Sequence, residues 1–312
     1  MSSPRLLKIL AVSAATCVLA AGTMLPADAA RHGHGHRAHH KHSSKAHFNH
    51  KHRWHHRHKA APKTQSPAPD PTPAPSDDSI YGPPPVRPTN AAKLFQWGNA
   101  SLKDEFHGPL ASNWLVKGGE PGMVRNQNGM LTLNTTSKSG TVTADWQAGA
   151  RQYGRWEARM RTRQYDKTGT PYRAVWELIP TSGEECKRSI VLSDSTIGQD
   201  PATMHLRNNG VDFSMTKLLD LRQDLFHTYA IEVTPDRISW FINTKVVMSE
   251  KRDAARTGES YNVRFRMAAP PGARMNQGRM QMDWVRYYNL DRKNAQSVAA
   301  PQAEMSSSDG TC

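Results

Sequence analysis

The sequence predicts an all-β domain, a sandwich or jelly roll of antiparallel strands, between residues 94 and 290. Apolar and polar residues alternate there with a period of two, which is the pattern of strands that bury one face. Turn signals such as Asn128-Gly129 and Pro271-Gly272 separate these runs. No stretch keeps a 3.6-residue period over three turns, which argues against long amphipathic helices. Strands over about 200 residues fit two stacked sheets in one domain.

Five segments carry the alternation most clearly. Each places its apolar residues two apart: 156–160, 229–233, 238–242, 261–267 and 280–284. We expect three tryptophans on these apolar faces to be core residues rather than platforms for sugars: Trp156, Trp240 and Trp284. We expect three acidic residues beside the strands to cap turns or to pair with arginines: Asp104, Glu105 and Asp283.

The first 29 residues have the three-part build of a secretory signal peptide. Arg5 and Lys8 precede an apolar run over residues 9–25, and Ala27-Asp28-Ala29 supplies a small-x-small cleavage pattern. The run is too short, and too diluted by Thr, Ser and Gly, for a membrane anchor. We therefore expect an exported protein, extracellular or associated with the cell envelope, with no membrane span after cleavage.

Residues 30–59 form an arm rich in His, Lys and Arg. The arm holds 12 of the 15 histidines and supplies more than half of the formal net charge of +14. Almost nothing in it is apolar, so we expect it to be disordered. The candidate metal ligands of the arm are His32, His34, His36, His39, His40, His55 and His56.

Three interpretations of the arm remain open. Imidazoles at this density can bind Zn²⁺, Ni²⁺ or Cu²⁺ loosely, without a fixed site, and no cofactor is otherwise required. The arm can instead anchor the protein to anionic cell-wall polymers, more strongly below about pH 6.5 as histidines protonate. The third interpretation is a solvated tail. A specific nucleic-acid function is not expected of an exported chain.

Composition also sets the boundaries of the domain. Residues 60–90 hold ten of the 21 prolines and predict a semi-rigid linker. The jelly roll is expected over residues 91–291, and the tail over 292–312, rich in Ala, Ser and Gln, is expected to be disordered. Three cysteines exclude a disulfide-dense scaffold. Cys186 and Cys312 either pair or stay free thiols, and the sequence leaves both alternatives open.

Five segments read, in order, KDEF at 103–106, YGRWEARM at 153–160, PYRAVW at 171–176, HTYAIEVTPDRI at 227–238 and MDWVRYY at 282–288. Together they resemble glycoside hydrolase family 16, the laminarinase and lichenase family. The matches follow the family's order and span most of residues 94–290. The resemblance implies a concanavalin-like β-jelly roll with a sugar-binding cleft.

The resemblance also implies a catalytic strand with the pattern Glu-x-Asp-x-Glu or, with a bulge, Glu-x-Asp-x-x-Glu. Residues two apart on a strand share a face, so the pattern gathers the nucleophile and the acid/base. The sequence contains neither pattern. With His205 as the guide, the three positions fall on Arg188, Ile190 and Ser193. With Gly183-Glu184 as the guide, they fall on Glu184, Cys186 and Ser189.

In neither register do two carboxylates share a face, so we expect no catalytic residue and lean against an enzyme. We interpret the chain as a secreted, carbohydrate-interacting pseudoenzyme that binds polysaccharide in its cleft. The alternative is an active endo-acting, β-glucanase-like hydrolase with a rearranged carboxylate pair, drawn from Glu177, Glu184 and Glu185. Asp194 and Asp200 are expected in a loop. A further alternative is a metal-binding or cell-wall-binding protein that acts through its arm.

Five residues are the candidates for binding the substrate. Trp146, Trp176 and His205 can stack on or hydrogen-bond to a sugar ring. Arg188 and Arg264 can bind anions, because a guanidinium matches carboxylate and sulfate oxygens. The expected partner is therefore a polysaccharide or an anionic cell-envelope polymer, bound by a monomer. Arg159, Arg161 and Arg266 lie on similar polar faces, and arginines on a solvated face would carry no such preference.

Overall fold

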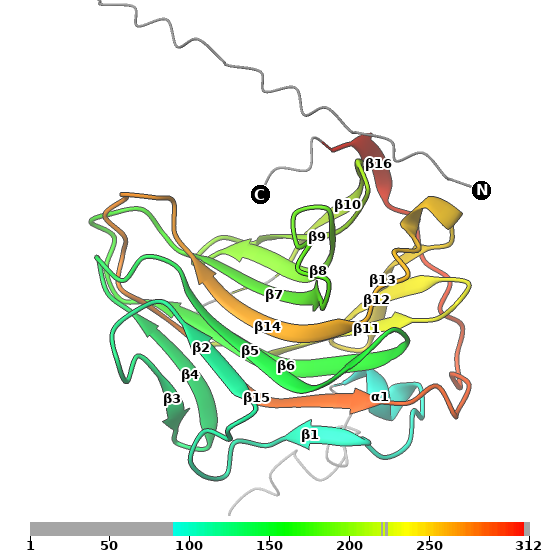
Figure 1. Cartoon of the computed structure of the whole chain (residues 1–312), viewed down its shortest axis with the longest axis horizontal. Coiled ribbons are helices and arrows are strands. Elements are labelled where there is room, and N and C mark those ends of the chain that lie inside the picture. The colour runs from blue at the N-terminus through cyan, green and yellow to red at the C-terminus, as the bar shows by residue number, and fades with distance from the viewer. Residues whose placement is uncertain (1–89, 220, 222–223, 309–312) are drawn as a thin grey trace, which may run out of the picture. The chain divides into compact units, whose positions relative to one another are not determined.

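The computed structural model describes residues 90–219, 221 and 224–308. The expected signal peptide, arm and linker lie outside the described residues up to residue 89, as does Cys312. The described chain forms two antiparallel sheets of eight strands each, stacked as bowed layers (Figure 1). The predicted all-β jelly-roll sandwich is thereby confirmed. Within the described residues the only helical segments are α1 (Ala91–Leu94) and a 3-10 turn (Asp253–Ala255).

Sheet A has the strand order β13-β12-β11-β6-β15-β4-β3, with β1 also paired to β15. Its strands are β1 (Leu102–Asp104), β3 (Val124–Gln127), β4 (Met130–Thr135), β6 (Gly154–Gln164), β11 (His227–Val233), β12 (Ile238–Ile242), β13 (Lys245–Glu250) and β15 (Gly278–Tyr288). Strands distant in sequence are neighbours at β11-β6-β15-β4, whereas β11, β12 and β13, and likewise β3 and β4, pair in sequence order.

Sheet B has the order β16-β10-β9-β8-β7-β14-β5-β2. Its strands are β2 (Trp114–Lys117), β5 (Val142–Arg151), β7 (Arg173–Pro180), β8 (Arg188–Thr196), β9 (Pro201–Asn208), β10 (Val211–Leu218), β14 (Tyr261–Ala268) and β16 (Glu304–Ser307). This sheet carries the candidate functional site.

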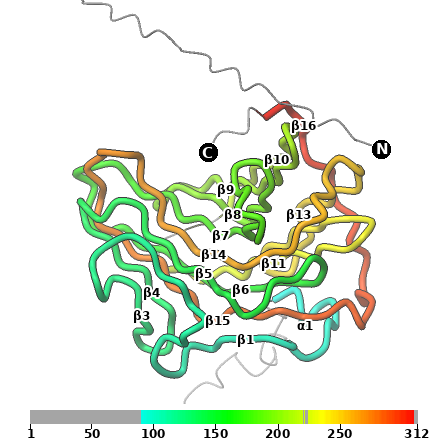
Figure 2. Tube along the Cα trace, viewed as in Figure 1, coloured from blue at the N-terminus to red at the C-terminus, as the bar shows by residue number. Residues whose placement is uncertain are grey.

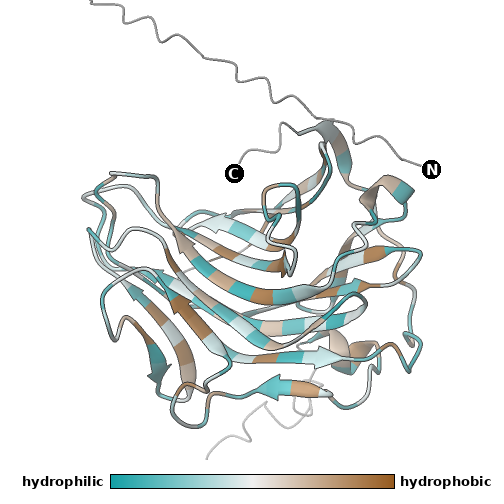
Figure 3. Cartoon of the chain, in the orientation of Figure 1, coloured by the Kyte–Doolittle hydropathy of each residue, from teal (hydrophilic) through white to brown (hydrophobic). Residues whose placement is uncertain are grey.

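The core lies between the sheets and follows from the alternation of the strands. Brown and teal bands alternate along strands such as β14, whose apolar residues face sheet A (Figure 3). Trp156 and Trp240 are buried in this core, which confirms the prediction for both. Trp284 is also buried, but it lies outside the core cluster. The Arg286 guanidinium covers its ring at 4.1 Å from the ring centroid.

The three acidic residues that were expected to serve structure do so. The Asp104 carboxylate accepts hydrogen bonds from the Phe106 backbone and the Trp114 indole, both at 2.8 Å. Glu105 accepts two hydrogen bonds of 2.9 Å from one arginine, Arg286. Asp283 accepts one of 2.8 Å from Arg159. The prediction of turn-capping and arginine pairing is confirmed.

The tail differs from the prediction of a disordered segment over 292–312. Residues 304–307 form β16, which pairs antiparallel with β10 at the edge of sheet B (Figure 2). Composition missed this strand because its pairing with β10, not its own apolar pattern, holds it in place: all four of its residues are exposed. Cys186 is disulfide-bonded, which excludes the free-thiol alternative for it. Its pairing with Cys312 stays a prediction.

Candidate functional site

Strand β8 presents one face to the core and the other to a surface pocket. Ile190 and Leu192 are buried in the core, and Ser193 is fully buried, opposite the core residue Trp176 of β7. A bulge against β9 lies between Val191 and Asp194, so the outward residues follow a spacing of two and then three. The outward residues are Ser189, Val191 and Asp194.

The prediction from the sequence offered two registers for the three motif positions. The first, Arg188, Ile190 and Ser193, has the same spacing as the outward residues but lies one residue before them. A slip of one residue moves every side chain to the other face of a strand, so Ile190 and Ser193 are buried instead of facing a cleft. The second register, on Glu184, Cys186 and Ser189, begins before β8. The continuous apolar run at 190–192 does not mark which residues of the strand face inward.

The pocket has a volume of about 150 Å³ and lies on the outward face of sheet B. We call it the β8 pocket. It is lined by Arg173, Glu177, Glu185, Ser189, Val191, Asp194, His205, Arg207, Arg264 and Arg266. Four guanidinium groups therefore share the pocket with three carboxylates.

Each carboxylate of the β8 pocket is paired through both of its oxygens. Arg266 donates to the two oxygens of Glu177 at 2.9 and 3.1 Å. Arg173 donates to both oxygens of Asp194, the Nε hydrogen bond being 2.9 Å. Arg264 likewise donates to both oxygens of Glu185. Such two-pronged pairs are the strongest that these groups form, so the carboxylates are held in fixed positions.

Arg264 also binds a second carboxylate, Asp145 on β5. Its Nε and Nη2 donate to the Asp145 oxygens at 2.7 and 2.9 Å. Burial alone would lower the pKa of Arg264, but the hydrogen bonds to Asp145 and Glu185 outweigh it and raise the pKa. Lys117 approaches Asp145 to 3.5 Å from the other side. The predicted anion-binding residue Arg264 thus lies in the pocket with its charge already matched.

His205 lies in the β8 pocket, as the prediction of a ligand-binding role requires. Its Nδ1 is 3.7 Å from a carboxylate oxygen of Asp212 on β10. The His205 contact lowers the pKa of Asp212, with a smaller contribution from Arg207, while burial acts in the opposite direction. The imidazole is 17% exposed and can reach a ligand in the pocket.

The other predicted binding residues lie elsewhere. Trp146 and Trp176 are 4% and 0% exposed and face the core, where Trp176 stacks on Phe265 at 5.9 Å. Their rings are not accessible to a sugar. Arg188 begins β8 outside the pocket lining and forms ion pairs with Glu184 and Glu259.

Sequence reasoning missed Arg173, Asp145 and Arg207 as parts of the site. On β7, Arg173 and Glu177 are polar residues that flank the apolar run of the strand. Asp145 similarly sits next to Trp146 on β5, and it is buried in an ion pair. Adjacent strand residues face opposite sides, so a buried tryptophan marks its polar neighbour as outward. That signal was present in the sequence.

In the part of the chain that the structure describes, no group of three or more His, Cys, Asp and Glu side chains could hold a metal ion. The seven histidines of the predicted loose metal site lie outside it. None of its helices is long and apolar enough to cross a membrane.

Comparison with known proteins finds one matching family model. The model of glycosyl hydrolases family 16 matches residues 111–286. No curated protein matches the chain.

Solved structures share the fold at low sequence identity. SCLam, a non-specific endo-β-1,3(4)-glucanase crystallised with 1,3-β-D-cellotriosyl-glucose, is 16% identical with a TM-score of 0.52, over 61% of this chain and 94% of that one. A structure described under endo-acting O-glycanases of the human gut microbiota is 18% identical with a TM-score of 0.52, over 62% and 91%. The laminarinase catalytic domain of Thermotoga maritima is 14% identical with a TM-score of 0.50, over 62% and 99%. At these identities the similarity shows the fold alone.

Proposed function

The chain belongs to family 16 of the glycosyl hydrolases, and on that premise we propose that its jelly roll binds polysaccharide in the β8 pocket without hydrolysing it. The outward face of β8 carries the proposal. Its residues at the spacing of a bulged Glu-x-Asp-x-x-Glu strand are Ser189, Val191 and Asp194. A retaining glycosidase needs two carboxylates about 5–5.5 Å apart, and this face supplies one.

The remaining carboxylate is also poorly suited to catalysis. Asp194 is held through both oxygens by Arg173, and its side chain is only 10% exposed. A general acid or nucleophile must reach the glycosidic bond with a free oxygen, and both oxygens of Asp194 are occupied by the Arg173 guanidinium. The hydroxyl of Ser189 and the isopropyl group of Val191 cannot replace a carboxylate pair in this reaction.

A second candidate function is hydrolysis through a rebuilt carboxylate pair. Glu177 and Asp194 line the same pocket. They come from the neighbouring strands β7 and β8, which pair with Glu177 opposite Val191. That arrangement makes Glu177 and Asp194 the pair to remove in a test of residual activity. Glu184 is a weaker choice because it is absent from the pocket lining and pairs with Lys187.

Binding to the β8 pocket is tested with the full chain and an unmodified β-1,3-glucan, by isothermal titration calorimetry. His205→Ala removes a partly exposed hydrogen-bonding group from the pocket, so we expect Kd to rise about tenfold, the equivalent of one good hydrogen bond. Arg188→Gln is the control, because this arginine lies near β8 but outside the pocket. If the two variants bind the glucan with equal affinity, the β8 pocket is not the binding site.

We also propose that the protein is secreted, on the strength of the signal-peptide pattern over residues 1–29. The arm would then meet the cell envelope, where loose metal binding and anchoring to anionic polymers both remain proposals. Neither proposal requires the β8 pocket, so the arm and the domain can be tested separately by removal of residues 30–59.

A further inference from the structure

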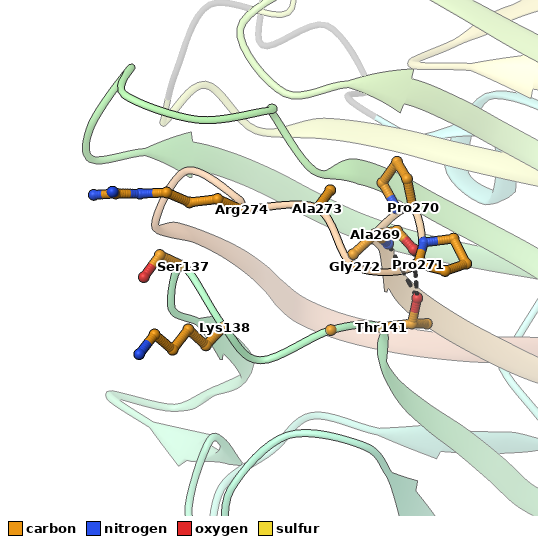
Figure 4. Close-up of a pocket in the computed structure, with 10 residues that line it drawn as sticks. Ser137, Lys138, Thr141, Ala269, Pro270, Pro271, Gly272, Ala273 and Arg274 are labelled. Carbon is orange, nitrogen blue, oxygen red and sulfur yellow. Dashed lines mark hydrogen bonds between the residues drawn. The ribbon is translucent and has the colours of Figure 1, made fainter. Parts of the chain in front are cut away.

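A pocket larger than the β8 pocket lies at one end of sheet B. It has a volume of about 680 Å³ and is formed by the loop that precedes β5 and the loop that follows β14 (Figure 4). We call it the loop pocket. Its lining includes Ser137, Lys138, Thr141, Pro270, Pro271 and Arg274.

Hydrogen bonds fix the two loops against each other. The Ala269 backbone N–H donates to the Thr141 hydroxyl at 3.0 Å, and that hydroxyl donates to the Ala269 carbonyl at 3.3 Å (Figure 4). At the other side of the pocket, the Met275 N–H donates to the Ser137 carbonyl at 3.1 Å. The pocket is therefore held at both sides rather than being a gap between unconnected loops.

Two cations border the loop pocket, and no carboxylate lines it. Lys138 follows Ser137 and Arg274 precedes Met275, so both cations flank the same backbone hydrogen bond. Figure 4 shows their side chains extending in the same direction. Among the described residues, neither side chain forms a hydrogen bond or an ion pair. Asp166 lies near enough for an electrostatic interaction with Arg274, but the two side chains form no ion pair.

The loop pocket thus differs from the β8 pocket in the state of its charges. In the β8 pocket, Arg173, Arg264 and Arg266 each hold a carboxylate through two hydrogen bonds. In the loop pocket, the lysine and the arginine retain their donors for a ligand. An oxyanion that reached Lys138 and Arg274 would gain charge-assisted hydrogen bonds without displacing a protein carboxylate.

The two pockets lie in succession along the same strands. Arg266 lines the β8 pocket and Ala269, three residues further along the chain, lines the loop pocket. Three residues of extended strand span roughly 10 Å. A short oligosaccharide that occupies the β8 pocket can therefore extend towards the loop pocket.

We propose that the loop pocket is a subsite for a sugar unit that carries an oxyanion, a carboxylate or a sulfate, so that the preferred ligand is an anionic polysaccharide. The inference rests on the proposed function of the β8 pocket. It moves the anion preference that the sequence suggested for Arg188 and Arg264 to Lys138 and Arg274, because the first two are already paired.

The test compares three forms of one β-1,3-glucan, unmodified, carboxymethylated and sulfated, with the full chain at fixed salt concentration. We expect at least one charged form to bind about tenfold more tightly than the unmodified form, the gain of one charge-assisted contact. Compared with the charge-matched control variant, the double variant Lys138→Gln/Arg274→Gln should bind that charged form about tenfold more weakly and keep its affinity for the unmodified glucan. The two charged arms identify which oxyanion the subsite favours.

The control variant is Arg125→Gln/Lys245→Gln, which removes the same charge from two exposed cations outside both pockets. The arm is present in every protein, so its contribution cancels. If the double variant and the control behave alike, the loop pocket is not an anion subsite. If the wild type binds the unmodified glucan and the charged forms equally, only this inference falls. If the wild type binds none of the three, the proposed function falls with it.

Discussion

Guanidinium groups hold the acidic side chains of the β8 pocket, and this pairing sets what each residue there can do. Arg264 is the most connected of them, because it bridges Asp145 and Glu185 while its own side chain is only 9% exposed. Asp145 is 2% exposed. A buried carboxylate without its partner is costly, so the arginine stabilises the strands as well as filling the pocket.

Replacement of Arg264 by methionine keeps most of the side-chain volume and removes the charge. We expect the free energy of unfolding, measured by urea titration, to fall by about 3 kcal/mol, because Asp145 would be left buried with only the largely exposed Lys117 as a partner. Arg188→Met is the matched control: its ion pairs are partly exposed to solvent, so the loss of stability should be clearly smaller than for Arg264→Met. A loss of equal size in both variants would contradict the structural role given to Arg264.

Glu157 is a second residue whose environment makes a measurable prediction. Its carboxylate is fully buried on β6 and accepts hydrogen bonds from the Ala91 and Ala92 backbone N–H groups at 2.6 and 3.3 Å. Burial raises the pKa of Glu157 from 4.5 to about 7, although the two backbone hydrogen bonds lower it in part. The folded state therefore binds more protons than the unfolded state between these two values.

It follows that the free energy of unfolding should decrease as the pH rises from 4.5 to about 7, by up to about 3 kcal/mol. Below pH 4.5 the Glu157 carboxyl is protonated in both the folded and the unfolded state, so its stabilising contribution is complete there. The contribution is lost as the pH rises through the folded-state pKa of about 7. Glu157→Gln should flatten the profile, as measured by denaturant titration across the window. An unchanged slope in the variant would show that other groups produce it.

Among the elements, β8 shows what the sequence could and could not predict. The alternation along β6, β12, β14 and β15 was sufficient to predict strands, because burial on one face repeats every two residues. The face of β8 was not predictable, because Ile190, Val191 and Leu192 are a continuous apolar run without the alternation that marks an inward face. Asp194 was expected in a loop and lies on the strand.

The tryptophans of β5 and β7 illustrate the same limit. Trp146 and Trp176 were expected at a sugar because aromatic rings bind sugars, but both fill the core beside Phe265 and Trp114. Residue type alone does not distinguish these roles. The neighbours Asp145 and Glu177 do distinguish them, since they occupy the outward positions of the same strands.

The segment after β15 is an element whose contribution can be measured by truncation. The Arg292 carbonyl accepts a hydrogen bond of 2.7 Å from Arg155, the Asn294 amide donates to Glu232 at 2.8 Å, and the Ala303 carbonyl accepts from Arg252 at 2.6 Å. A chain that ends at residue 291 loses all three contacts. We expect it to lose roughly 3 kcal/mol in free energy of unfolding, about 1 kcal/mol per contact.

A chain that ends at Ala303 is the comparison for that truncation. It also lacks Cys312, but it keeps the three contacts and loses only β16, whose four residues are exposed. Its stability should lie well above that of the shorter chain. Equal stability of the two truncations would assign the effect to the missing cysteine or to β16 instead.

At the scale of the whole molecule, the arm and the domain are expected to work outside the cell. If the signal peptide is cleaved after Ala29, the secreted protein begins at Ala30 and retains the arm. N-terminal sequencing of protein recovered from the culture medium or the cell envelope tests this directly. Recovery of an intact Met1 in the cell would contradict export.

The two pockets together agree with the proposed function. The outward face of β8 carries one carboxylate in place of a pair, and the loop pocket supplies unpaired cations beyond the end of β14. Binding a polysaccharide requires polar, accessible pockets, whereas hydrolysis requires a pair of carboxylates. The structure has the polar pockets, but strand β8 carries a single carboxylate, Asp194.

The most direct test of this account is the release of reducing ends from neutral and anionic polysaccharides by the full chain, at near-stoichiometric protein and with long incubation. We predict no release from any polymer that the folded protein binds. Release that is abolished by Glu177→Gln or Asp194→Asn would contradict the account, because it would show that these two residues form a working glycosidase pair.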